Sequence, residues 1–81
     1  MNHKYIIQSV LFPTDIFSIE EAKAWLEEHK LKNKKVDMRS IQFTRWRQIS
    51  PEVLKKKGYT KYFTYKLKNG VEYIVSFKII K

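Results

Sequence analysis

Residues 61–78, KYFTYKLKNGVEYIVSFK, contain two alternating runs of aromatic and β-branched residues separated by an Asn-Gly pair, and this stretch decides the fold. An Asn-Gly pair between two such runs is typical of a β-hairpin. A two-residue turn would place Lys66 opposite Tyr73 and mix charged with apolar side chains on one face. A three-residue loop over residues 68–70 instead places Lys66 opposite Glu72. We therefore predict the three-residue loop, with its glycine in the left-handed conformation beside a bulge.

Upstream of the hairpin, residues 17–30 repeat their apolar positions with the period of an α-helix. Ser18 and Glu21 have the spacing of a capping box, which satisfies backbone donors at a helix start. Trp25 lies on the apolar stripe and is expected in the core, with His29 at the boundary of the stripe. These residues predict one long amphipathic helix, followed by a left-handed residue at Asn33.

Two further segments have strand-like composition. Residues 4–12 are rich in Ile, Val, Phe and Tyr and predict an interior strand with Ile6 and Val10 on one face. Residues 36–49 alternate irregularly, which predicts either one long strand bent by a bulge near Ser40 or two shorter strands.

A short helix is predicted between these segments and the hairpin. Ser50 is an N-cap candidate followed by a proline, and Gly58 can end the helix. With about two turns, the helix must depend on packing through Val53 and Leu54. The element order β-α-β-α-β-β predicts an α+β domain spanning residues 1–81, with the long helix across a four-stranded, mostly antiparallel sheet.

Composition narrows the class of protein. The chain has 81 residues and no cysteine, which fits one hydrophobic core and excludes disulfides and thiol chemistry. The apolar runs are too short for a membrane span, and the N-terminal residues do not resemble a signal peptide. We therefore expect a protein of the cell interior that is neither secreted nor bound to a membrane.

Charge is the most informative global property. The formal net charge is +9, yet residues 1–31 carry −2 and residues 32–81 carry +11. A charge this far from zero opposes folding by self-repulsion, so it suggests a polyanionic partner, although a lysine-rich surface can also simply confer solubility.

The sequence offers little for catalysis. His3 lies near the terminus, and Glu27, Glu28 and His29 are consecutive, so they point in different directions and cannot converge on a metal ion. The two glycines have ordinary turn roles, and there is no phosphate-binding glycine loop. We expect no enzymatic activity, catalytic residue, metal, cofactor or small-molecule substrate.

Binding chemistry is better represented. Arg45 and Arg47 alternate around Trp46, so both guanidinium groups can face one side of a strand while the indole packs inward. Among the hairpin aromatics, Tyr62 is expected to be exposed, whereas Phe63, Tyr65 and Tyr73 are expected in the core. The predicted nucleic-acid-binding residues are Arg39, Arg45, Arg47, Lys55, Lys56, Lys57, Lys61, Tyr62, Lys66 and Lys68.

The chain also resembles a known family over most of its length. The pattern is QSVLF, FSIEEAKAWLEEHKLK, KVD, RWRQISP, LKKKGYTKYFTYKL and GVEYIVSFK. It is similar to a small α+β domain that recurs in large DNA viruses of protists, including the marseillevirus group, and in tailed phages. The chain departs from the family at Thr64, where an arginine is usual, and at Thr44, where an aromatic residue is usual. The resemblance implies an accessory or virion-packaged protein, located in virions and the host-cell interior.

Two functional hypotheses follow. In the first, the protein binds nucleic acid without sequence preference through phosphate contacts, with DNA favoured over RNA because of the resemblance to DNA viruses. In the second, it is a non-enzymatic interaction module that binds an acidic protein or forms a homodimer through sheet edges, including the C-terminal FKIIK. The lysines within residues 32–35 (Lys32, Lys34 and Lys35) and residues 55–57 can also be read as a nuclear import signal, a pattern common to basic proteins.

Overall fold

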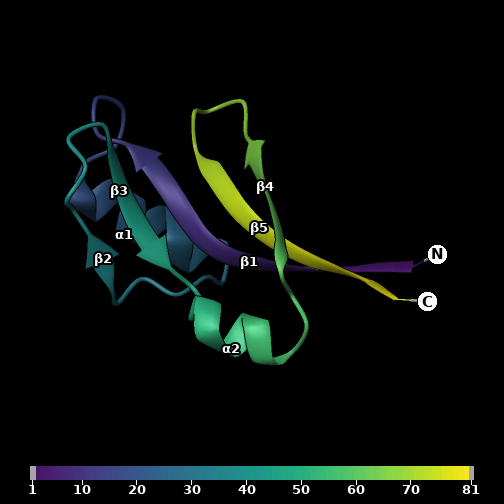
Figure 1. Ribbon diagram of the computed structural model, residues 1–81. Coiled ribbons are helices and arrows are strands. Elements are labelled where there is room, and N and C mark those ends of the chain that lie inside the picture. Colours follow the sequence, from purple (N-terminus) through teal and green to yellow (C-terminus); the bar gives the residue numbers. More distant parts are fainter. Residues whose placement is uncertain (1, 81) are drawn as a thin grey trace.

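A computed structural model describes residues 2–80 and places five strands and two helices within them (Figure 1). In chain order the elements are β1 (Asn2–Pro13), α1 (Ile19–Glu28), β2 (Val36–Asp37), β3 (Phe43–Arg47), α2 (Pro51–Lys56), β4 (Lys61–Lys66) and β5 (Glu72–Ile80). The strands form one antiparallel sheet in the order β2-β3-β1-β5-β4. The α+β class is confirmed, but the sheet has five strands because residues 36–49 contain two short strands, the second of the two alternatives.

Helix α1 begins where its capping box predicts. The Ser18 Oγ accepts from the Glu21 backbone N–H, and the Glu21 Oε1 accepts from the Ser18 N–H at 2.9 Å. The helix is ten residues long and shorter than expected, because His29 is its C-cap and Lys30 turns into the left-handed region with φ of 58°. Lys30, and not Asn33, is therefore the helix-ending left-handed residue.

Strand β1 is interior, as expected, but it contains a bulge that the sequence did not predict. Ile7 lies opposite Val75 and Ser9 lies opposite Ile74, so Gln8 is an extra residue without a partner in the register. The insertion reverses the alternation of side chains. Ile6 and Val10, expected on one face, therefore point to opposite faces.

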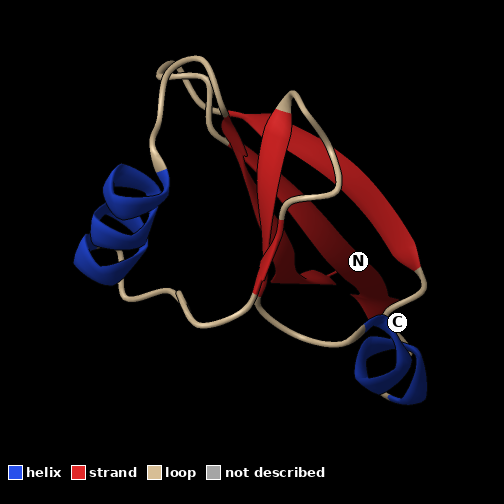
Figure 2. Ribbon diagram, turned by 90° about the vertical axis from the view of Figure 1, so that its left-hand side faces the viewer, coloured by secondary structure: helices blue, strands red, loops and turns tan. Residues whose placement is uncertain are grey.

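The two faces of the sheet are covered unequally. Helix α1 packs on one, here called the α1 face, and α2 lies at one end of the other, here called the open face (Figure 2). The core lies between α1 and the sheet and consists of Val10, Phe12, Ala22, Leu26, Trp46 and Val71. On the open face Leu54 of α2 is fully buried, whereas Val53 is 40% exposed, so only one of its two expected anchors packs inward.

The hairpin of β4 and β5 forms with the predicted three-residue loop. The Leu67 N–H donates to the Val71 carbonyl at 2.8 Å, and Lys66 lies opposite Glu72. Gly70 has φ of +94°, the left-handed conformation expected of it. The predicted register of this hairpin, which separates charged from apolar side chains, is confirmed.

The burial of the hairpin aromatics differs from the prediction. Tyr62 is exposed as expected and Tyr73 packs against the core, but Phe63 is 40% exposed and Tyr65 is 55% exposed. The reason is the limited reach of α1, because the core cluster that it covers takes its strand residues from β1 and β3, with Tyr73 of β5 packed against it and no described residue of β4. Phe63 and Tyr65 lie on the α1 face but beyond the helix.

Candidate nucleic-acid interface

Strand β3 presents two arginines on the open face. Its residues alternate between buried and exposed, so Arg45 and Arg47 are exposed while Trp46 is 1% exposed in the core. The Trp46 Nε1–H donates to the Thr44 Oγ1 at 3.0 Å, which satisfies the polar group of the buried indole. The predicted orientation of the β3 side chains is confirmed, because the indole points inward and both guanidinium groups point outward.

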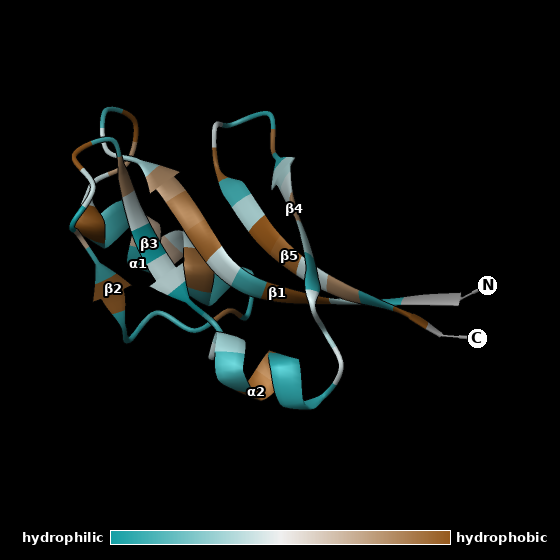
Figure 3. Ribbon diagram, in the orientation of Figure 1, coloured by the Kyte–Doolittle hydropathy of each residue, from teal (hydrophilic) through white to brown (hydrophobic). Residues whose placement is uncertain are grey.

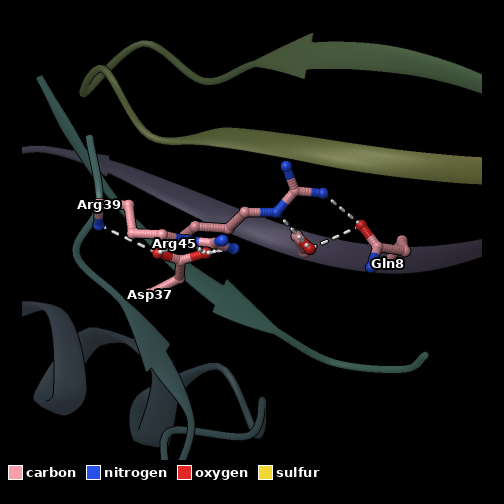
Figure 4. Close-up of polar contacts among 5 residues, drawn as sticks. Gln8, Asp37, Arg39 and Arg45 are labelled. Atoms are coloured by element: carbon pink, nitrogen blue, oxygen red, sulfur yellow. Dashed lines mark hydrogen bonds and ion pairs between the residues drawn. The ribbon is translucent and has the colours of Figure 1, made fainter. Parts of the chain in front are cut away.

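The Arg45 side chain is held in place by the bulge of β1 (Figure 4). Its Nη2 donates to the Gln8 Oε1 at 2.8 Å and its Nε donates to the Ser9 Oγ at 3.1 Å. Gln8 is itself fixed, because its Nε2 donates to the Ile49 carbonyl at 3.1 Å. Figure 4 shows the remaining nitrogen of Arg45, Nη1, pointing away from Gln8 and Ser9. The guanidinium is therefore oriented before any ligand arrives, which lowers the entropy cost of binding an anion.

Beside β3 lies a cleft of about 750 Å³ between the segment that follows α1 and the segment that joins β3 to α2. Gln48 ties the two segments together, since its Oε1 accepts from the Lys32 N–H at 2.7 Å and its Nε2 donates to the Lys32 carbonyl at 2.9 Å. We call this hollow the basic cleft. Its lining residues are Leu31, Lys32, Asn33, Lys34, Lys35, Arg47, Gln48, Ile49, Ser50 and Val53.

The basic cleft concentrates positive charge. Lys32, Lys34, Lys35 and Arg47 line it, and no carboxylate does among the residues that the structure describes. Figure 3 shows the corresponding hydrophilic segment between α1 and β2. Like charges gathered around a concave surface strengthen the local potential and raise the local concentration of anions. The arrangement is therefore suited to a polyanion.

A second hollow of about 160 Å³ adjoins the cleft, and Lys35 and Arg47 line both. Arg45 and Asp37 also line the smaller hollow. The Asp37 carboxylate forms an ion pair with Arg39, in which the Arg39 Nη2 lies 2.6 Å from the Asp37 Oδ2. Hydrogen bonds from the Arg39 side chain and backbone lower the pKa of Asp37 to about 2. The carboxylate thus remains charged at neutral pH and neutralises Arg39, which weakens Arg39 as a phosphate ligand.

The other predicted site residues are dispersed. Tyr62 and Lys66 share the open face with Arg45, but Lys66 lies on β4, three strands away from Arg45 and about 15 Å across the sheet. Lys61 points to the α1 face, opposite Phe77 in the register. The remaining lysines are exposed on α2 and in the hairpin loop, namely Lys55, Lys56, Lys57 and Lys68. The structure brings together the two arginines and not the whole predicted set.

Sequence reasoning missed the lysines of the cleft. Lys32, Lys34 and Lys35 were interpreted only as part of a nuclear import pattern, because nothing local indicates that they face Arg47. The contact that joins the two segments is visible only in the structure, where the Gln48 side chain makes reciprocal hydrogen bonds to Lys32.

Comparisons with protein-family models, curated proteins and solved structures give no match to this chain. Within residues 2–80 there is no group of three or more histidine and acidic side chains arranged to hold a metal ion. Neither described helix has the length and apolar character needed to cross a membrane. The case for a function therefore rests on the geometry and charge of the site.

Proposed function

We propose that the protein binds nucleic acid without sequence preference, with the basic cleft and Arg45 as the phosphate-binding surface. The observation that carries the proposal is the cluster of Lys32, Lys34, Lys35 and Arg47 around one cleft. Phosphate contacts from lysine and arginine supply most of the affinity in non-specific binding. The net charge of +9 adds long-range attraction to a polyanion.

The chemistry of the cleft favours positioning on a phosphate backbone over base recognition. Arg45 offers a fixed guanidinium nitrogen, and the three lysines offer flexible ammonium groups that adapt to phosphate spacing. Contacts to phosphates carry no sequence information in themselves. We therefore expect similar affinity for duplexes of different sequence.

The test is fluorescence anisotropy of a labelled 20-base-pair DNA duplex at about 50 and 200 mM salt, where phosphate binding weakens strongly. The variant Lys35→Ala/Arg47→Ala removes two charges that line both hollows. We expect it to weaken binding and to reduce the salt slope by about 2. The control, Lys4→Ala/Lys23→Ala, removes two exposed charges that do not line the cleft and should have a much smaller effect. Equal losses in both variants would place the binding surface elsewhere.

A competing proposal is an interaction module that pairs through sheet edges. It is supported by β4, an edge strand whose six residues are all exposed. Lys61 and Lys66 at the ends of β4 oppose it, because edge lysines discourage strand pairing. Within the described part of the C-terminal FKIIK, Phe77 pairs with both β4 and β1, whereas residues 78–80 extend past β4 and pair in the sheet only with β1. These three residues are therefore the part of β5 that offers an edge. Sedimentation equilibrium separates the proposals, because edge pairing requires a dimer in the absence of nucleic acid.

The proposed viral setting, an accessory or virion-packaged protein acting in virions or the host-cell interior, is supported by the sequence resemblance alone. The preference for DNA over RNA has the same support. Repeating the anisotropy measurement with a 20-base-pair RNA duplex tests it, since a stronger RNA complex would reverse the proposed preference.

A further inference from the structure

A group of exposed aromatic side chains lies on the α1 face, in the part of the sheet that α1 does not cover. Tyr5 is 59% exposed, Phe63 is 40% exposed and Tyr65 is 55% exposed. They come from strands β1 and β4, and Phe77 of the intervening strand β5 completes the group between Tyr5 and Phe63. We call these four residues the aromatic patch. In Figure 1, β4 and the terminal ends of β1 and β5 lie to the right of α1.

The rings of the aromatic patch are arranged against one another. The Tyr5 and Phe63 centroids are 6.1 Å apart with an interplanar angle of 88°, and those of Phe63 and Phe77 are 5.7 Å apart at 60°. The first pair is edge-to-face and the second is tilted, and such ring contacts favour defined orientations. Tyr65 follows Phe63 on the same face at a separation of about 7 Å along the strand. The patch therefore offers several ring surfaces at fixed positions.

On the strands that carry the patch, the described charged residue on this face is a lysine, whereas the acidic residues of this face belong to α1. Lys61 lies opposite Phe77 in the register and points to the same side of the sheet as Phe63. Strands β1, β4 and β5 contain one acidic residue, Glu72, and it points to the open face with Lys66. Self-association through the patch is unfavourable, because each of the two copies would bring a net charge of +9. A ligand that suits both the exposed aromatic rings and the neighbouring lysine is a planar, apolar group attached to an anion.

We infer that the aromatic patch is a stacking surface for the bases of single-stranded nucleic acid, with Lys61 as a neighbouring phosphate contact. This inference rests on the proposed nucleic-acid binding and names a substrate class within it. Bases of a duplex are stacked on each other and have no ring face to offer, whereas unpaired bases stack readily on Tyr and Phe. The patch thus gives the protein a preference for single strands that the basic cleft alone does not provide.

The experiment compares labelled 20-nucleotide oligo(dT) with a labelled 20-base-pair duplex, using the full chain in anisotropy titrations. The variant Phe63→Ala/Tyr65→Ala removes two rings, and loss of each stacking ring costs about fivefold or more, so we expect oligo(dT) to bind about 30-fold more weakly. Duplex affinity should stay within about twofold. Ile41→Ala is the matched control, because Ile41 is an exposed apolar residue in the loop between β2 and β3.

Two conservative variants keep the test valid if the double variant folds poorly. Tyr65→Phe retains the ring and should bind oligo(dT) as the unchanged protein does, whereas Phe63→Leu retains an apolar side chain without a ring and should bind more weakly. Circular dichroism checks that each variant is folded. If Phe63→Leu and the double variant bind oligo(dT) normally, the stacking surface is refuted while duplex binding by the cleft is untouched.

If the patch binds something other than unpaired bases, the sedimentation and anisotropy measurements give different results. A dimer that dissociates in Phe63→Ala/Tyr65→Ala during sedimentation, with unchanged oligo(dT) affinity, would assign the patch to a second copy of the chain and overturn the inference. The inference would also be overturned if the unchanged protein bound the duplex and oligo(dT) with equal affinity and if Phe63→Ala/Tyr65→Ala weakened both complexes equally. Loss of duplex binding alone in Lys35→Ala/Arg47→Ala would leave the patch as the separate single-strand site and support it.

Discussion

Phe12 and Phe63 are the same residue type on the same face of one sheet, yet Phe12 is fully buried and Phe63 is 40% exposed. Phe12 lies beneath α1, where it contacts Phe17 at 5.2 Å and Trp25 at 5.5 Å between ring centroids. Phe63 lies on β4, where it contacts the partly exposed rings of the patch. The difference teaches that alternation places a side chain on a face, whereas the reach of the helix decides whether that face becomes core.

The comparison is sharpest when both phenylalanines are truncated. We expect Phe12→Ala to lower the free energy of unfolding by about 3–5 kcal/mol, because it leaves a cavity in a packed core. Phe63→Ala should lower it by about 1 kcal/mol or less, since the site is already open to water. Urea unfolding followed by circular dichroism measures both. Similar losses would mean that the patch is part of the core.

The polar side of the sheet offers a second comparison, between a buried glutamine and an exposed one. Gln8→Ala removes the amide that bonds Arg45, Ser9 and the Ile49 carbonyl, and it leaves buried groups unsatisfied. We expect a loss of about 1–3 kcal/mol in unfolding free energy. Gln42→Ala in the exposed loop between β2 and β3 is the control and should cost little. A neutral Gln8→Ala would contradict the role of the bulge in fixing Arg45.

A smaller effect is expected at the start of α1. Ser18→Ala removes the cap and should destabilise the protein by about 1 kcal/mol. Hydrogen bonds from Ser18 lower the pKa of Glu21 below its usual value, so the ionised carboxylate stabilises the folded state above that usual value. This stabilisation is lost as the pH falls through the lowered pKa. Ser18→Ala keeps the backbone N–H that bonds the Glu21 carboxylate and removes only the hydroxyl, so NMR titration should find the Glu21 pKa raised part of the way to its usual value. An unchanged pKa would show that the hydroxyl does not contribute.

The smallest effect concerns the ion pair at the margin of the cleft. Asp37→Asn releases Arg39 and removes the carboxylate from the smaller hollow. We expect the thermal midpoint to change little and duplex affinity to rise about two- to fivefold, because an exposed charge attracts a phosphate only modestly through water. In the unchanged protein Asp37 should titrate near pH 2, so the pair persists above that pH and is lost below it. Weaker duplex binding in Asp37→Asn would indicate that Asp37 positions Arg39 productively.

The features that sequence predicted well depend on near neighbours. The capping box of Ser18, the loop at residues 68–70 and the alternation around Trp46 each involve residues a few positions apart, and each is present in the structure. Local hydrogen bonds and the period of two along a strand are enough to determine them.

The features that sequence did not predict depend on distant segments. The exposure of Phe63 and Tyr65 follows from where α1 ends, and the proximity of Lys32 to Arg47 follows from how two loops meet at Gln48. The bulge at Gln8 was hidden because both phases of β1 are largely apolar, so its alternation carried no signal for the inserted residue.

The most direct test of the phosphate-binding surface is a two-dimensional NMR titration of the ¹⁵N-labelled protein with a 20-base-pair DNA duplex at low salt. We expect the largest amide shift changes at residues 31–35 and 47–50, which line the basic cleft, with smaller changes at Arg45. Amides of β4 should change little with the duplex. Shift changes confined to α2 or β4, or none at all, would contradict the assignment of the cleft as the binding surface.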